Sequence, residues 1–260
     1  MTRPRGRRPD ESSGGWCLLA VALMVLAWPD AAAAYRPFDG TDAAVVDKGV
    51  LEIELGPVGY LREVSAEFVI APAIVLNWGL SSRWEVVLEG ANVLAADDVP
   101  GRSSLALEDT GLFLKGVLRE GSLQGASGPS IATEFGVLLP TISGEPGTGL
   151  EALFIVSQRW DALTVHLNGA IARTRSKRQG LFGGMILEGP RAWTVRPVAE
   201  VFVASEGGAP SVKSALAGAI WNVRDGLSVD VGFRYAWQGH ESGVEVRGGF
   251  SWAFSLARGP

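Results

Sequence analysis

The sequence has one cysteine and two histidines among 260 residues, which excludes two common ways of stabilising a chain. A single cysteine cannot form a disulfide scaffold. One Cys and two His cannot alone supply the four ligands of a structural zinc site, and no metal or cofactor is expected. Basic residues are also scarce, with 23 Lys and Arg against 28 Asp and Glu, for a net charge of −5. Nucleic acid, which selects proteins with a basic patch, is therefore not an expected partner.

Long apolar runs are missing too. Beyond the N-terminal region no stretch approaches the roughly 18 consecutive apolar residues of a membrane-spanning helix. Within that region, four arginines in the first eight residues precede an apolar stretch at 16–28, and three alanines follow at 32–34. This order predicts a secretory signal peptide over 1–34 that removes Cys17 on cleavage. The mature protein is expected to be exported.

The remaining sequence alternates between apolar and polar residues. In 227–237, Leu, Val, Val, Phe, Tyr and Trp alternate with Ser, Asp, Gly, Arg and Ala. Alternation of this kind predicts strands with one apolar face. Ten strands remain an alternative to twelve, because the pattern is weak at 181–188 and 212–221. The predicted strands are 50–59, 65–78, 84–94, 107–119, 129–139, 150–160, 163–172, 181–188, 193–204, 212–221, 227–237 and 244–256.

Strand length and connections indicate a membrane. Most predicted strands approach the 9–11 residues that a tilted strand needs to cross a bilayer. Connections from even to odd strands are shorter than the others, as in a barrel with both termini in the periplasm. Pro72 and Pro197 lie inside predicted strands, where a missing N–H requires a bulge or a local break. The fold class expected is all-β: a transmembrane antiparallel up-and-down β-barrel in the outer membrane, because closure removes the sheet edges that hydrocarbon cannot satisfy.

Tryptophan placement is typical of the same architecture. An indole combines an apolar body with a polar N–H, which suits a membrane–water interface. Tryptophans capping the core of a soluble β-sandwich are the alternative. The six residues predicted to form an aromatic girdle, five beside short connections and one at the opposite end, are Trp78, Trp84, Trp160, Trp193, Trp221 and Trp237.

Several segments resemble the phenol-degradation (MetA-pathway) outer-membrane β-barrel family. Residues 36–54 read Arg-Pro-Phe-Asp-Gly-Thr-Asp-Ala-Ala-Val-Val-Asp-Lys-Gly-Val-Leu-Glu-Ile-Glu, and residues 75–85 read Val-Leu-Asn-Trp-Gly-Leu-Ser-Ser-Arg-Trp-Glu. Glu-Asp-Thr-Gly at 108–111, Leu-Pro-Thr at 139–141 and Glu200 continue the similarity. The chain departs from the family pattern at Ala43 and in the tail after residue 256. The resemblance implies an outer-membrane barrel that moves small, often aromatic, compounds.

The polar face of the predicted strands defines a candidate lumen. We expect a segment 35–49 that is periplasmic or tucked into the lumen, a barrel over 50–256 and a tail at 257–260. A charged lumen can set ion preference, or its acids and bases can pair and fill it. The predicted lumen-lining residues are Glu52, Glu54, Glu67, Glu85, Glu89, Lys115, Arg119, Glu134, His166, Asn168, Arg196, Glu200, Asp230, Arg234, Glu245 and Arg247.

Two further patterns suggest other functions. A two-residue turn at 161–162 would place Ser157 opposite His166, with Asn168 nearby, and these residue types occur in lipid hydrolases. Inward-facing Ser, His and Asn more often only bond one another, so no catalytic residue is assigned. The basic loop 173–180 suits lipopolysaccharide phosphates or is simply solvated. The favoured function is a passive channel for small solutes, aromatic or hydrophobic ones among them. A non-conducting surface barrel is the alternative, and a lipid hydrolase comes third.

Overall fold

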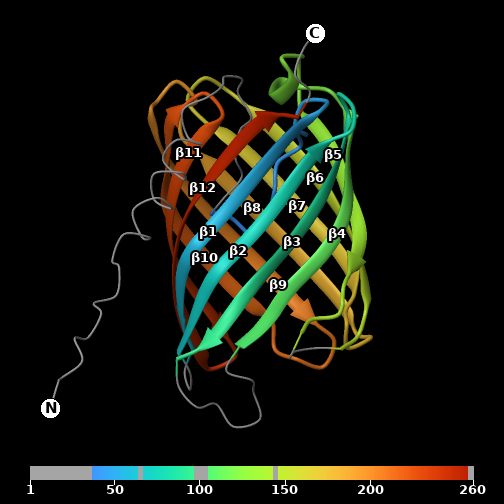
Figure 1. Ribbon diagram of the computed structural model, residues 1–260, viewed down its shortest axis with the longest axis vertical. Helices are drawn as coiled ribbons and strands as arrows, with labels where there is room; N and C mark the ends of the chain where they lie inside the picture. Colours follow the sequence, from blue (N-terminus) through green and yellow to red (C-terminus); the bar gives the residue numbers. More distant parts are fainter. Residues whose placement is uncertain (1–36, 64–66, 97–104, 143–145, 257–260) are drawn as a thin grey trace, which may run out of the picture.

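The computed structural model describes residues 37–63, 67–96, 105–142 and 146–256, and the strands in these ranges close into a barrel (Figure 1). A one-turn 3-10 helix, η1 (Ser122–Gln124), interrupts their order. No helix in the described ranges is long and apolar enough to cross a membrane. The twelve strands are β1 (Val50–Arg62), β2 (Glu67–Gly79), β3 (Trp84–Ala95), β4 (Leu105–Arg119), β5 (Ser130–Leu138), β6 (Gly149–Arg159), β7 (Thr164–Arg173), β8 (Gln179–Glu188), β9 (Val195–Glu206), β10 (Val212–Arg224), β11 (Leu227–Gln238) and β12 (Glu241–Ser255).

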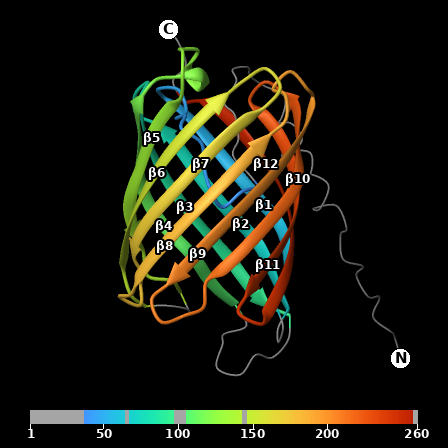
Figure 2. The ribbon, with the colours of Figure 1, turned by 180° about the vertical axis from the view of Figure 1, so that it is seen from behind.

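Each strand pairs antiparallel with its sequence neighbours, and β12 closes the barrel on β1. The strands are inclined to the long axis in both views, as closure of a twisted sheet requires (Figures 1 and 2). The predicted twelve strands are confirmed, including both weak segments, and the ten-strand alternative is wrong. The signal peptide and the tail predicted at the two ends lie outside the described residues.

The barrel is apolar outside and polar inside, the reverse of a soluble protein. On β11, Asp230 is 5% exposed while its neighbour Val231 is 53% exposed. The same alternation follows the whole strand, because side chains two residues apart share a face. A soluble β-sandwich buries its apolar face, so this pattern excludes that alternative. All six predicted girdle tryptophans lie on the exterior, between 37% and 56% exposed.

An irregularity in β2 shifts its inside–outside alternation. The register between β2 and β3 slips between Ile70 and Ala73, around the cis peptide bond before Pro72. Beyond this point Phe68 is buried against Val93 inside the barrel. Glu67, adjacent to Phe68, therefore faces outward. Its prediction as a lumen residue was wrong because strict alternation was carried back across Pro72.

The second proline needs no bulge. Strand β9 stays in register with β10 through Pro197, which lies opposite Ala219. The Pro197 carbonyl accepts the Gly189 N–H at 2.9 Å, just beyond the end of β8. Because the N–H and C=O of one residue point to the same side of a strand, the missing N–H falls where the β8 ladder has already ended.

The predicted difference between long and short connections is smaller than expected. Strands β11 and β12 are joined by only Gly239 and His240, where the sequence predicted a longer outer loop. Backbone pairing continues to Gln238 opposite Glu241, beyond the alternating apolar residues. Gly239 has φ of +62°, the left-handed conformation that tight hairpins require. Hydropathy locates the membrane-spanning part of a strand but not the ladder that extends past it.

Candidate functional site: the lumen and its inner segment

The segment 37–49 precedes β1 and runs inside the barrel as far as Val46, after which Asp47 and Lys48 are exposed. Its backbone is hydrogen-bonded by side chains of the wall at successive heights, from Arg247 at one end to Glu85 at the other. The chain then leaves the lumen where the Gly49 N–H donates to Gly79 O at 2.8 Å, beside the end of β2. We call residues 37–49 the inner segment.

Two wall residues bind the inner segment through its backbone amides. Glu200, 2% exposed on β9, accepts N–H groups from Asp39 and Gly40, the latter at 2.8 Å. Asn168 on β7 accepts the Thr41 N–H and donates to the Thr41 carbonyl, both at 3.0 Å. The second arrangement reproduces a β-ladder with a side-chain amide. Both residues were predicted to face the lumen, and their bonds satisfy backbone groups that would be costly to bury alone.

Ser157 and His166 form a second anchor. They are register partners on β6 and β7, as the predicted two-residue turn requires. The Ser157 hydroxyl lies 2.7 Å from His166 Nδ1 and accepts the Ala43 N–H at 2.9 Å. His166 Nε2 lies 3.3 Å from a Glu188 carboxylate oxygen.

The same geometry argues against the hydrolase alternative. Ser157 has no exposed surface, and its hydroxyl oxygen is occupied by the Ala43 amide. A nucleophile must reach its substrate, and a lipid substrate lies outside this wall. Ser157 and His166 therefore hold the inner segment.

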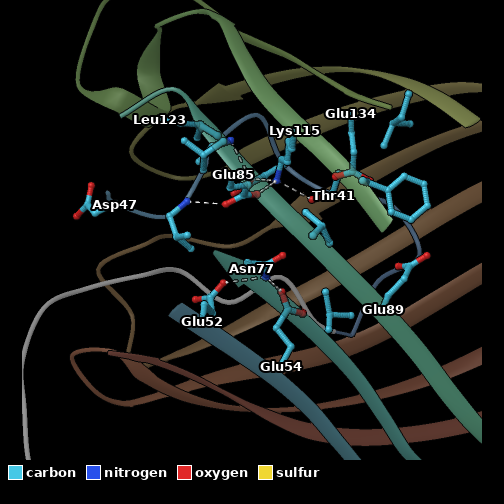
Figure 3. Close-up of a pocket in the computed structure, with 18 of the residues that line it drawn as sticks. Thr41, Asp47, Glu52, Glu54, Asn77, Glu85, Glu89, Lys115, Leu123 and Glu134 are labelled. Carbon is cyan, nitrogen blue, oxygen red and sulfur yellow. Dashed lines mark hydrogen bonds and ion pairs between the residues drawn. The ribbon is translucent and has the colours of Figure 1, made fainter. Parts of the chain in front are cut away.

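Lys115 lies among carboxylate side chains inside the lumen (Figure 3). Its Nζ lies 3.3 Å from Glu85, 3.5 Å from Asp42 of the inner segment and 3.1 Å from the Thr41 hydroxyl. Glu85 in turn accepts the Val46 N–H at 2.7 Å. Because β3 and β4 pair Glu85 with Lys115 directly, the two side chains share one face. One lysine thus links two strands to the inner segment.

A second charged cluster lies on β11 and β12. Arg234 forms ion pairs with Asp39 and with Glu245, the latter at 3.2 Å. Arg247 donates to both oxygens of Glu245, at 2.6 and 2.8 Å, and to the Pro37 carbonyl at 2.9 Å. The Arg234 guanidinium also lies 5.3 Å from the centre of the Phe202 ring, within cation–π range. The first residues of the inner segment are therefore held by two arginines.

The other predicted lumen residues divide into two groups. Most face inward, and the remainder of that group comprises Glu52, Glu54, Glu89, Glu134, Arg196 and Asp230. Arg119 does not: it is exposed beyond a register shift in β4, and it donates to the Pro129 carbonyl at 2.7 Å. It fastens the connection between β4 and β5, and its prediction as a lumen residue was wrong because the register shift interrupts the alternation.

Sequence reasoning missed several inward residues. Glu151, Arg159 and Glu188 face the lumen, as do Asp39 and Asp42 of the inner segment. On β6 the inward face also carries Leu153 and Ile155, which pack with Ala43. These apolar side chains inside the lumen are exceptions to the expectation that inward-facing residues are polar. The available signal was that the missed residues of β6 lie an even number of positions from Ser157 and therefore share its face of the strand.

Two cavities remain between the inner segment and the wall. One of about 340 Å³ extends from Arg191 and Arg159 past Lys115, and one of about 440 Å³ reaches Arg175 near the opposite end. They share Glu54, Glu89 and Glu151 in their linings. The space beside the inner segment is thus bordered by carboxylates along β1, β3 and β6.

The predicted basic loop is partly engaged within the protein. Arg175 donates to the Leu139 and Thr110 carbonyls, both at 2.7 Å. Lys177 bonds to the Thr148 carbonyl. Two of the four basic residues thus tie this loop to the β5–β6 connection, and one of the two also to β4.

Comparisons with known proteins define the fold. No family model matches the chain, and no curated protein matches it by sequence. The COG4313 outer membrane channel from Pseudomonas putida F1 superposes with a TM-score of 0.57 at 11% identity, over 84% of this chain and 100% of that one. The KdgM porin in complex with disordered oligogalacturonate gives 0.51 at 11%, over 79% and 99%. The NalP autotransporter translocator domain from Neisseria meningitidis gives 0.50 at 12%, over 80% and 90%. The chain therefore has the fold of outer-membrane β-barrels, porins included.

Proposed function

We propose that this protein is an outer-membrane channel for small molecules whose inner segment narrows the lumen. The observation that carries this proposal is the pair of adjoining cavities beside the inner segment, which together run from Arg191 to Arg175. A sealed barrel has no need of two polar cavities that share a wall. The apolar exterior and the exposed tryptophans support residence in a bilayer, and the fold shared with porins agrees.

A third cavity supports a proposal for the class of solute. It measures about 510 Å³ and lies toward the Arg175 end, and its lining combines alanines and Phe182 with the carboxylates of Asp109, Glu151 and Glu206. Phe182 packs on Phe202 with ring centroids 5.2 Å apart. Small side chains and aromatic rings accept apolar or aromatic groups. This lining supports solutes with an aromatic or hydrophobic part, the class that the family resemblance implies.

A non-conducting barrel is the second candidate, favoured by how tightly the inner segment is held. Glu200, Asn168, Ser157 and Glu85 each accept one or more of its backbone N–H groups. Such a segment closes the lumen if it never moves. The loops would then carry the function, including contact with lipopolysaccharide.

Single-channel recording in planar bilayers distinguishes the two candidates. The channel proposal expects small, discrete conductance steps from the full mature chain. A barrel that shows heat-modifiable gel mobility, and is therefore folded, but stays electrically silent with its inner segment both present and removed overturns the channel proposal.

A further inference from the structure

The cavity at the Arg191 end of the lumen has one wall rich in guanidinium groups. Arg159 on β6, Arg191 in the β8–β9 connection and Arg196 on β9 all line it. Glu188 lies 3.4 Å from Arg196 and also 3.3 Å from His166. Arg196 thus shares its carboxylate with a histidine, and the three guanidinium groups concentrate positive charge on this wall.

Two of these arginines have unused hydrogen-bonding capacity. Arg196 is only 7% exposed, and within the described residues its Nε has no hydrogen-bond partner. The buried Nε of Arg159 is likewise without a partner in the described part of the chain. Native proteins pair nearly all buried polar groups, so these two exceptions show that side chains of the wall do not fully engage the two guanidinium groups. A guanidinium is the group best suited to bind a carboxylate.

The same cavity has an acidic wall on β1 and β2. Glu52 is 3% exposed and Glu54 is 5% exposed. Asn77 Nδ2 donates to both carboxylates, at 3.4 Å and 2.8 Å. The two carboxylates and the amide point toward one another in Figure 3. An amide carries no charge, so these hydrogen bonds bring no positive charge to the two carboxyl groups, and an ammonium group would be attracted to them.

We propose that this cavity binds a small zwitterion, a molecule with one carboxylate and one ammonium group. The carboxylate binds Arg196 and Arg159, and the ammonium binds the Glu52–Glu54 side. A second carboxylate on the ligand would meet the acidic wall, so dianions are disfavoured. The volume of about 340 Å³ lies in the range of about 300–1,000 Å³ found for ligand sites. The inference rests on the proposed channel function, because a solute reaches the cavity through the lumen.

Ligand-observed NMR on the full mature protein in detergent tests this inference with γ-aminobutyrate, butyrate and n-butylamine. These probes have the same chain length and carry both charges, the carboxylate only or the ammonium only. We expect γ-aminobutyrate to bind about tenfold more tightly than either single-charge probe. Equal binding of all three, or preference for butyrate alone, overturns the inference.

Variants locate the site. R196Q is expected to weaken γ-aminobutyrate about tenfold and leave butylamine unchanged, whereas E52Q weakens γ-aminobutyrate and leaves butyrate unchanged. R159Q repeats the first test should R196Q fail to give a heat-modifiable barrel. R83Q is the matched control, because Arg83 forms an exposed ion pair with Glu120 and does not line the cavity. If R83Q weakens binding as much as R196Q, the site is wrongly placed.

Conductance separates this inference from the channel proposal. Binding of γ-aminobutyrate to a barrel that stays electrically silent overturns the channel and leaves the zwitterion site standing. Conductance without selective binding overturns the site and leaves the channel standing.

Discussion

The backbone N–H of Ala43 donates to the hydroxyl of Ser157 at 2.9 Å, across 114 positions of sequence. Because of this bond, Ser157, which lies beside His166, anchors the inner segment and is not free to act as a nucleophile. It also shows how the lumen is filled: the wall supplies side-chain acceptors, and the inner segment supplies backbone donors. The inner segment is therefore a separable element whose removal should leave the barrel intact.

Deleting residues 37–46 tests this separation. The strand ladder closes between β1 and β12 without these residues, so the barrel should still form. Loss of the segment leaves the lumen wall lined by Glu200, Asn168 and Glu85 open to water, and conductance in planar bilayers should rise several-fold.

The control for the deletion is S157A, which removes one anchor and keeps the segment. Its conductance should remain near that of the unchanged protein, because Glu200 and Asn168 still hold the segment. Unaltered conductance in the deletion variant, with a folded barrel, would show that the inner segment does not limit the pore.

Lys115 should be the most sensitive single position in the lumen. Substituting glutamine removes the cation that lies 3.3 Å from Glu85 and 3.5 Å from Asp42, leaving buried carboxylates uncompensated. Breaking a buried pair on one side costs about 3–5 kcal/mol. Urea titration of the refolded barrel should show a loss of this size in the free energy of unfolding.

Two further variants calibrate the Lys115 measurement. K115Q/E85Q should recover part of the lost free energy of unfolding, because it removes one of the uncompensated carboxylates together with the lysine. E120Q, which breaks the exposed pair with Arg83 at 2.9 Å, should cost about 0–1 kcal/mol. A loss in K115Q no larger than that of E120Q would mean that the lysine is solvated in the folded protein.

The barrel was predictable because alternation is a local property. Each strand can be recognised from apolar residues two positions apart, such as Val229, Val231 and Phe233 on β11. Predictions failed where the backbone breaks that period, at Pro72 and at Arg119, since a register shift leaves no mark in hydropathy.

The content of the lumen was less predictable for a different reason. Its contacts join residues far apart in sequence, such as Gly40 with Glu200, at a separation of 160. No periodicity encodes which acceptor meets which amide. The sequence left open whether 35–49 enters the lumen, and only the three-dimensional contacts place residues 37–46 there.

Gly136 on β5 should tolerate no side chain. A Cβ at this position would lie 2.2 Å from Leu112 O and 2.6 Å from Phe113 Cα, both backbone atoms of β4. Backbone cannot move aside as a flexible side chain can, so G136A should cost about 1–3 kcal/mol or prevent folding. Gly183 on β8 is the matched control, with no atom within 4 Å of its Cβ position. Equal folding yields of G136A and G183A, measured by heat-modifiable mobility, would contradict the close approach of β4 and β5.

The exterior should show the depth dependence of a bilayer. Val231 lies near the middle of β11 and is 53% exposed, whereas Val223 lies one residue from the end of β10 and is 42% exposed. Arginine on a lipid-facing surface costs about 2–4 kcal/mol at the midplane and about 0–1 kcal/mol near the interface. Refolding into lipid vesicles should therefore show V231R destabilised by the larger amount and V223R almost unaffected. In water both valines are merely exposed, and neither substitution would cost much. Equal, small effects would mean that lipid does not surround this surface, and they would contradict the proposal of an outer-membrane channel.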